Sequence, residues 1–235
     1  MAAMTLSCVT VNAQEKYFTA PAAGSLQLDE QGFIRRWCVL EPISKPNHTN
    51  IVFTDSYLRD VFAQEYFKDQ MTILPKDGQK VKAKFEKVDS PKDFRRVDPS
   101  TLKVTRGTET LRWHKLDSKT FNLKLLRFGE YQTKRLYGVI YWVVTVINCD
   151  EDMQNVRLAV GSNSASQWWV NGEEALLLSG DRRMVVDDGM SNRITLKKGQ
   201  NIIRGAIING PGMSDFCVRF VKADGTVIKN GITIQ

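Results

Sequence analysis

The side chains that could support hydrolysis are few in this chain. Ser164 lies in GSNSA (161–165), which lacks the final glycine of the Gly-x-Ser-x-Gly elbow of α/β-hydrolases. The only histidines, His48 and His114, have no acidic partner in a recognisable motif. Carboxylates that could form a glycosidase pair lie near expected turns, where such groups are usually solvated: Glu173, Glu174, Asp181, Asp187 and Asp188. The sequence therefore favours a non-catalytic protein and predicts no catalytic residue; an enzyme is kept as the alternative.

Metal and cofactor chemistry has little support in the sequence. With two histidines and no Cys-x-x-Cys pair, a zinc site is not expected. No Walker or Rossmann glycine loop is present. Asp187-Asp188-Gly189 offers oxygens for a structural calcium ion, but a turn is the favoured interpretation. We predict no cofactor, with that calcium ion as the open alternative.

Charge and hydropathy argue against a nucleic-acid partner and against a transmembrane helix. The net charge is +7, but 33 basic and 26 acidic residues are mixed along the chain, whereas nucleic-acid binders concentrate basic residues in one patch. No apolar run reaches the 18 or so residues that a membrane helix needs. We expect no nucleic-acid partner and no transmembrane segment. Attraction to acidic polymers remains a secondary possibility.

The N-terminal residues suggest export. Val11-Asn12-Ala13 is followed abruptly by Gln14-Glu15-Lys16, and Val-x-Ala before a polar stretch is a secretory cleavage pattern. The basic segment that begins such signals is missing, so residues 1–13 are interpreted as the remnant of a signal peptide. We expect a periplasmic, cell-surface or secreted protein. Whether Cys8 carries a lipid is left open.

Three further cysteines, Cys38, Cys149 and Cys217, lie in apolar, strand-like runs, where a free cysteine behaves as a small buried hydrophobe. A Cys38–Cys149 or a Cys149–Cys217 disulfide stays open, because spacing alone does not decide pairing.

The second half of the chain has the pattern of short antiparallel strands. YGVIYWVVTVIN (137–148) is apolar on both faces and predicts a central strand buried on both sides. NVRLAVGS (155–162) and FCVRFV (216–221) alternate, with one apolar face each. Hairpins are expected around Asn171-Gly172 and Lys198-Gly199, and a turn at Asp224-Gly225. The fold class is therefore all-β, an antiparallel jelly-roll β-sandwich.

The first half is less regular. Residues 54–70 have apolar side chains at helical spacing, with Thr54 or Asp55 as N-cap. The lysine-rich stretch 75–106 contains Pro91 and Pro99 and is interpreted as a decorated insertion, whereas TFNLKLLRF (120–128) has strand character. We predict one domain, 26–235, with a partly helical insertion at about 54–110.

The order of segments resembles a known family. The aromatic strand 137–146, then VRLAVGSNSASQWWVNGEE, ITLKKGQNIIRGAIING and FCVRFVKADGTVI follow in the order of galactose-binding-like β-sandwich modules. RRWCVLEPI and LRWHKL resemble the family's opening strand and its later tryptophan strand. Such modules occur in secreted bacterial proteins that degrade polysaccharides, including some described as acetylxylan esterases. The chain departs from the family pattern at residues 162–165 and 210–215, where acidic and aromatic loop residues are lost.

The resemblance implies a carbohydrate-binding or accessory module, whose partner is a polysaccharide or oligosaccharide and also a carbohydrate-active enzyme. A carbohydrate esterase or glycoside hydrolase acting on plant polysaccharide is one alternative, and a protein–protein assembly module is another. Sugar rings are bound by an aromatic plane with polar groups at its rim. The candidate ligand-binding residues lie on or near the expected loops: Trp168, Asn163, Gln167, Asp181, Arg182 and Arg183.

Two adjacent tryptophans precede the Asn171-Gly172 turn. Because neighbouring side chains of a strand point to opposite faces, only one can serve a one-sided core. We expect Trp169 to pack in the core and Trp168 to be covered by the insertion or to face a ligand. Trp37, Trp113 and Trp142 are expected in the core.

Overall fold

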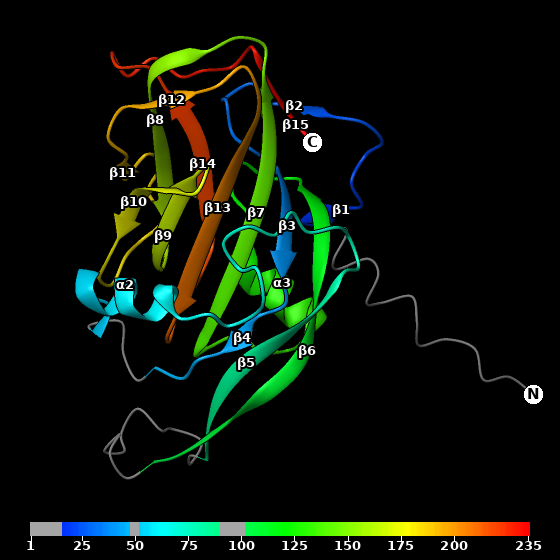
Figure 1. Cartoon of the computed structure of the whole chain (residues 1–235), viewed down its shortest axis with the longest axis vertical. Coiled ribbons are helices and arrows are strands. Elements are labelled where there is room, and N and C mark those ends of the chain that lie inside the picture. Colours follow the sequence, from blue (N-terminus) through cyan, green and yellow to red (C-terminus); the bar gives the residue numbers. More distant parts are fainter. Residues whose placement is uncertain (1–15, 48–51, 90–101) are drawn as a thin grey trace, which may run out of the picture.

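Two antiparallel sheets form the body of the protein. The computed structural model describes residues 16–47, 52–89 and 102–235. Within these residues an eleven-stranded sheet, with the central order β1-β6-β3-β7-β13-β9-β10, faces a four-stranded sheet in which β11, β12 and β14 pair with β8 (Figure 1). The predicted all-β sandwich is confirmed. The predicted signal-peptide remnant, Cys8 and His48 lie outside the described residues.

The elements have the following bounds. The large sheet contains β1 (Phe18–Thr19), β2 (Leu26–Gln27), β3 (Arg36–Leu40), β4 (Ile43–Ser44), β5 (Lys80–Asp89), β6 (Lys103–Ser118), β7 (Val139–Cys149), β9 (Ala165–Val170), β10 (Glu173–Leu178), β13 (Gly199–Asn209) and β15 (Ile232–Ile234). The small sheet contains β8 (Met153–Ser162), β11 (Gly189–Met190), β12 (Ile194–Leu196) and β14 (Phe216–Val221). The helices are α2 (Asp55–Ala63) and α3 (Leu125–Gln132).

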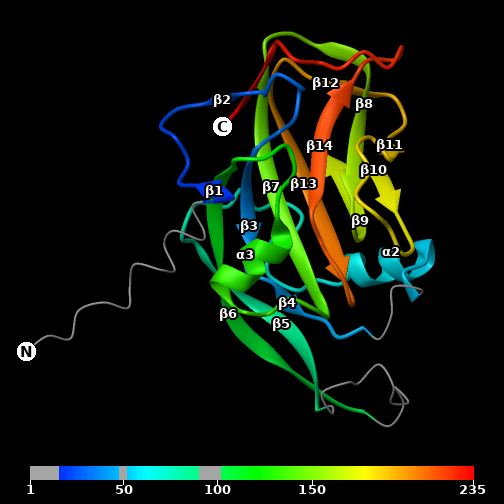
Figure 2. The same cartoon turned by 180° about the vertical axis from the view of Figure 1, so that it is seen from behind.

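The inner core lies between the two sheets. Val156, Leu158 and Val160 of β8 face it, as do alternate residues of β14, which confirms the alternation seen in the sequence. Helix α3 closes the same side, with Leu125 and Phe128 in this core (Figure 2). The small sheet therefore buries one apolar face against the large sheet.

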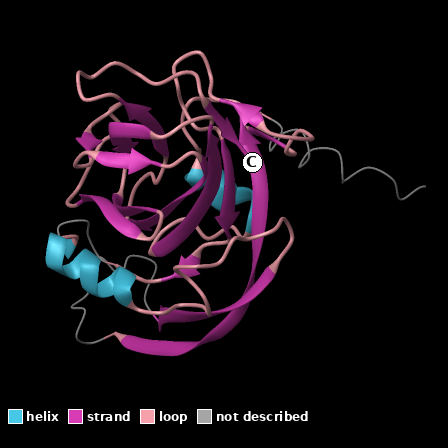
Figure 3. Cartoon of the chain, turned by 45° about the horizontal axis from the view of Figure 1, so that its top comes forward, coloured by secondary structure: helices cyan, strands magenta, loops and turns pink. Residues whose placement is uncertain are grey.

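The large sheet also carries a second, outer core on its opposite face. There, α2 and the segment after it pack on β7, β9 and β13, and residues of β5 and β6 extend the same core. Figure 3 shows a helix lying against the strands at this side of the molecule. As predicted, β7 is apolar on both faces, because each face meets a separate core. Trp37, Trp113 and Trp142 are buried, as expected.

The region predicted as an insertion contains α2, β5 and the first part of β6. Thr54 caps α2, since its side chain accepts a hydrogen bond from the Tyr57 backbone N–H. The helix ends at Ala63, earlier than the apolar spacing indicated. Residues 80–89 pair antiparallel with residues 103–112, so part of the lysine-rich stretch is regular β-structure. That this region is an insertion stays a prediction.

Two local predictions are wrong. Residues 125–132 form α3 and not a strand, because Leu125, Phe128 and Gly129 at helical spacing all face the buried side. No hairpin forms around Lys198-Gly199: β12 pairs with β8 in the small sheet and β13 pairs with β7 and β9 in the large sheet. The chain crosses between the sheets at this point. By contrast, Asn171 and Gly172 make the expected hairpin turn, with φ of 53° and 88°.

Trp168 is a central side chain of the inner core. It is 0% exposed, lies edge-on to Trp37 and Phe216, and donates from Nε1 to Ser166 Oγ at 2.9 Å. Its register partner is Gly205, where a Cβ would lie 2.5 Å from the indole ring. The missing side chain at 205 therefore makes room for this tryptophan. The expectation that Trp168 faces a ligand or the insertion is wrong.

We predict that Gly205→Ala destabilises the protein, because the added methyl group overlaps the Trp168 indole. Overpacking of this kind costs about 1–3 kcal/mol, which urea denaturation measures. In a Trp168→Leu background the same substitution should cost much less. Equal costs in both backgrounds would contradict the assigned packing.

The three described cysteines are free and buried. Neither disulfide left open by the sequence is formed: Cys38 belongs to the outer core, Cys149 to the inner core, and Cys217 lies near Met184 on the outside of the small sheet. Burial raises the pKa of each thiol to about 11. We therefore expect these thiols to be structural and to react slowly.

Alkylation tests this interpretation. At pH 8 iodoacetamide should not modify Cys38, Cys149 and Cys217 of the native protein. The raised pKa keeps each thiol protonated, and burial keeps the reagent away. In urea all three should react, as peptide mass mapping would show. Rapid modification of any of them in the native protein would contradict the packing.

Candidate functional site

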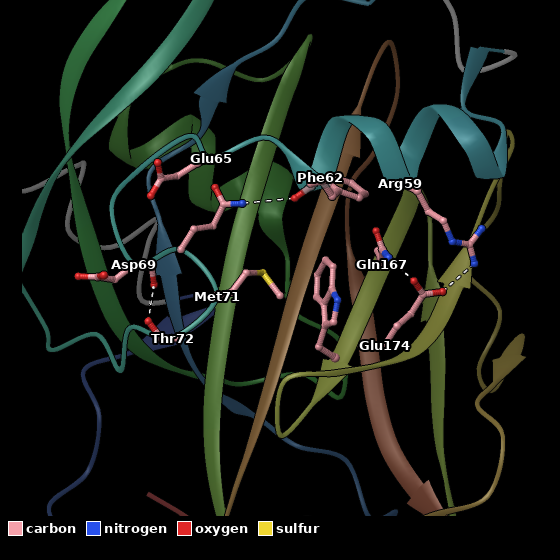
Figure 4. Close-up of a pocket in the computed structure, with 11 residues that line it drawn as sticks. Arg59, Phe62, Glu65, Asp69, Met71, Thr72, Gln167 and Glu174 are labelled. Carbon is pink, nitrogen blue, oxygen red and sulfur yellow. Dashed lines mark hydrogen bonds and ion pairs between the residues drawn. The ribbon is translucent and has the colours of Figure 1, made fainter.

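A cavity of about 540 Å³ lies between α2, the segment after it and the β9–β10 hairpin (Figure 4). This volume is in the range of small-molecule sites. Its lining combines buried and exposed residues: Arg59, Phe62, Ala63, Glu65, Asp69, Gln70, Met71, Thr72, Gln167, Trp169 and Glu174. Buried side chains form a floor, and exposed charged and polar side chains surround it.

Trp169 is the aromatic residue of this floor. It is 8% exposed and stacks on Trp142, with ring centroids 5.8 Å apart and planes within 14°. These tryptophans come from β9 and β7, which lie on either side of β13, and Ala206 of β13 is the register partner of Trp142. The small side chain of Ala206 leaves room for the two indoles to approach. The central strand of the sheet thus fixes the orientation of Trp169.

Gln167 and Glu174 form a polar network beside this indole. Gln167 lies on the same face of β9 as Trp169, is 4% exposed, and donates from Nε2 to Glu174 Oε2 at 2.7 Å. The other Glu174 oxygen accepts from Arg59 of α2 at 2.7 Å (Figure 4). The Gln167 Oε1 oxygen accepts no hydrogen bond from the described residues. A buried acceptor without a partner is costly, and this oxygen has almost no surface accessible to solvent.

The segment after α2, residues 64–74, forms the opposite wall of the cavity. Side-chain hydrogen bonds hold this wall in place. Gln70 accepts from the Tyr66 backbone N–H and donates to the carbonyls of Phe62 and Gln64. Asp69 takes a positive φ of 59°, and its carbonyl accepts from the Thr72 N–H. The wall is therefore an ordered turn and carries Met71 at its tip.

Arg204 attaches this wall to the sheet. Its side chain is 3% exposed, and Nη2 donates to the Ile73 carbonyl at 2.8 Å. No carboxylate among the described residues pairs with it, and burial lowers its pKa to about 10. A buried guanidinium without a counter-charge is costly, so Arg204 acts through its hydrogen bond to the wall and gives little stability by itself.

Of the residues predicted from sequence as ligand contacts, Gln167 alone lines this cavity. Trp168 is enclosed in the inner core. Asn163 lies in the β8–β9 turn, where its backbone N–H donates to the Asp215 carbonyl. Arg182 donates to the Ser179 carbonyl and pairs with Asp188. The remaining two, Asp181 and Arg183, are exposed in the loop after β10.

Ser164, His114 and Asp187, which were considered for catalysis or calcium binding, have structural partners. Ser164 is buried, and its Oγ donates to the Met213 carbonyl at 2.7 Å. His114 contacts Glu41 through Nε2 at 3.0 Å. Asp187 accepts from Arg219 Nε at 2.9 Å, so this carboxylate already faces a cation. No cluster of metal-ligating side chains occurs among the described residues.

Trp169 is buried in the outer core, as expected, but its position at the cavity floor and the whole wall were not predicted. The signal for Trp169 was present: Gln167 and Trp169 are two residues apart in a strand, so choosing Gln167 as a contact implies Trp169 and excludes Trp168. The wall had no comparable signal, because residues 64–74 approach β9 only through the tertiary fold.

Comparisons with known proteins were made for sequence and for structure. No protein-family model and no curated protein matches the chain. A β-glucosidase from Kluyveromyces marxianus in complex with glucose aligns over 47% of this chain and 14% of its own, with 18% identity and a TM-score of 0.35. A family 35 carbohydrate binding module from an environmental isolate aligns over 40% and 69%, with 19% identity and a TM-score of 0.28. A PA14 sugar-binding domain from an RTX adhesin aligns over 84% and 96%, with 10% identity and a TM-score of 0.36. These TM-scores assign no family, and the fold described above rests on the chain's own strands.

We predict that Arg204→Met loosens the wall while changing global stability little. The lost hydrogen bond from a charged donor is worth about 1.5–3 kcal/mol locally, which corresponds to roughly tenfold or faster amide exchange in residues 69–74. Hydrogen-exchange mass spectrometry measures this. Arg219→Met, on the small sheet, is the control and should leave the wall unchanged; equal protection of the wall in both variants would sink the assigned role.

Proposed function

We propose that the protein is a non-catalytic carbohydrate-binding module and that the cavity over Trp169 holds one sugar ring of an oligosaccharide or polysaccharide. The observation that carries the proposal is an indole held in a cavity of about 540 Å³ with an amide and carboxylates beside it. This is the combination that sugars require, since their rings have apolar C–H faces edged by hydroxyl groups.

The polar groups of the cavity suit hydroxyl ligands. Gln167 has a buried acceptor oxygen without a partner, and the half-exposed carboxylate of Glu174 is held beside the indole by Gln167 and Arg59. Because the floor belongs to two paired strands, its groups are positioned before a ligand arrives, which lowers the entropy cost of binding. The exposed groups of the wall lie opposite and leave the mouth accessible.

The environment of Ser164 supports a binding role in preference to an esterase. Its hydroxyl donates to a backbone carbonyl and lies 3.2 Å from Asn209 Oδ1, so neither contact is with a base that could remove its proton.

The wider setting of the module follows from the segment order noted in the sequence. We propose an accessory role in polysaccharide degradation outside the cytoplasm, beside a carbohydrate-active enzyme such as an acetylxylan esterase. Among the described residues, no helix combines the length and apolarity needed to cross a bilayer.

The binding prediction is specific to one indole. Trp169→Ala should weaken binding to the best ligand of a polysaccharide panel by about tenfold or more, because the aromatic contact to the sugar face is lost. Affinity electrophoresis ranks the ligands, and isothermal titration calorimetry measures the loss.

Tyr137→Ala is a surface control, because Tyr137 is an aromatic residue that is 57% exposed and lies outside the cavity; circular dichroism checks that the Trp169→Ala variant, which loses a core side chain, is folded. The control should bind as the parent protein does. Absence of binding to every polysaccharide would overturn the proposal, as would equal losses in the two variants. Acetate release from acetylated xylan by the purified protein, abolished by Ser164→Ala, would show an esterase instead.

A further inference from the structure

The cavity is acidic on a basic protein. Its lining contains three carboxylates, Glu65, Asp69 and Glu174, and one guanidinium, Arg59, so its formal charge is −2. The whole chain carries +7. Glu65 and Asp69 lie on one side of Met71, and the Arg59–Glu174 pair lies on the other (Figure 4). The local field at the mouth therefore opposes the field of the molecule as a whole.

The unused hydrogen-bonding groups of the cavity are mainly acceptors. Among the described residues, the carboxylates of Glu65 and Asp69 form no ion pair, and Gln167 Oε1 has no donor. The principal charged donor, Arg59, is already engaged by Glu174. The Gln70 amide N–H groups already donate to the backbone carbonyls of Phe62 and Gln64. An occupant that satisfies this cavity must supply donors and positive charge.

We propose that the cavity selects a sugar that carries a free amine, a glucosamine-type residue, over the corresponding neutral sugar and over a uronic acid. This inference rests on the proposed function, because Trp169 supplies the sugar platform and the carboxylates supply the selectivity. An ammonium group offers three donors and a positive charge to an acceptor-rich mouth. A uronic acid brings a second anion to the same groups and is rejected by like-charge repulsion.

The test compares ligands that share linkage and length. Binding of three β-1,4-linked tetramers, those of glucosamine, of glucose (cellotetraose) and of glucuronic acid, is measured by calorimetry, at a pH where the amine is protonated and at low and high salt. The glucosamine tetramer should bind several-fold more tightly than cellotetraose, and the difference should shrink at high salt. Glu65→Gln and Asp69→Asn should each weaken glucosamine binding about threefold and leave cellotetraose binding unchanged. Asparagine at position 69 tolerates the positive φ of Asp69, so the wall is preserved.

Glu30→Gln removes the same charge at an exposed position outside the cavity and should change nothing. Equal affinity for the amino and neutral tetramers would overturn the inference while leaving the proposed function intact. Equal weakening by Glu30→Gln would also overturn it, because the effect would then belong to the whole molecule. Tighter binding of tetralysine than of any sugar would assign the cavity to a basic peptide and overturn it too. Failure of every sugar to bind would instead overturn the proposed function.

Discussion

The contact between Trp168 and Gly205 is the constraint on which the rest of the structure depends. A tryptophan can occupy the middle of the inner core because the residue beside it on β13 has no side chain. Once Trp168 is enclosed, the alternation of β9 leaves no choice for Gln167 and Trp169, which must face the opposite side of the large sheet. The position of the candidate site is therefore a consequence of core packing in a neighbouring strand.

The outer core supplies the walls that turn the β9 surface into a cavity. Trp169 on a bare sheet would be an exposed platform, but α2 and the wall make it the floor of a cavity. The polar anchors of this cover include the Arg59–Glu174 pair at one side and the hydrogen bond from Arg204 to Ile73 at the other, and the Lys84 N–H of β5 also donates to the Tyr66 carbonyl. The first anchor is exposed and weak, whereas the second is buried and carries an uncompensated charge. These contacts therefore fix the position of the cover and contribute little to the free energy of unfolding.

The fold was largely predictable, and the site was not. Alternation in β8 and β14 and the apolar faces of β7 are local patterns, and they predicted the sandwich correctly. A short apolar run does not distinguish a helix from a strand, which is why α3 was missed. The assignment of Trp168 failed for a different reason. Each face of β9 carries one tryptophan, and every residue of this strand is buried, so the sequence does not show which tryptophan faces the inner core. Only the pairing with Gly205, far along the chain, decides it.

The separation of floor and wall has an evolutionary consequence. The floor comes from paired strands whose side chains are coupled to both cores, so substitutions there disturb folding. The wall is a single continuous segment in which Tyr66 and Phe67 are buried in the outer core, whereas Glu65, Asp69, Met71 and Thr72 are exposed. Changes at its exposed positions can alter what the cavity accepts while the sandwich stays intact. Related chains are therefore expected to diverge in ligand first at the exposed positions of residues 64–74 and to keep the tryptophan pair behind them.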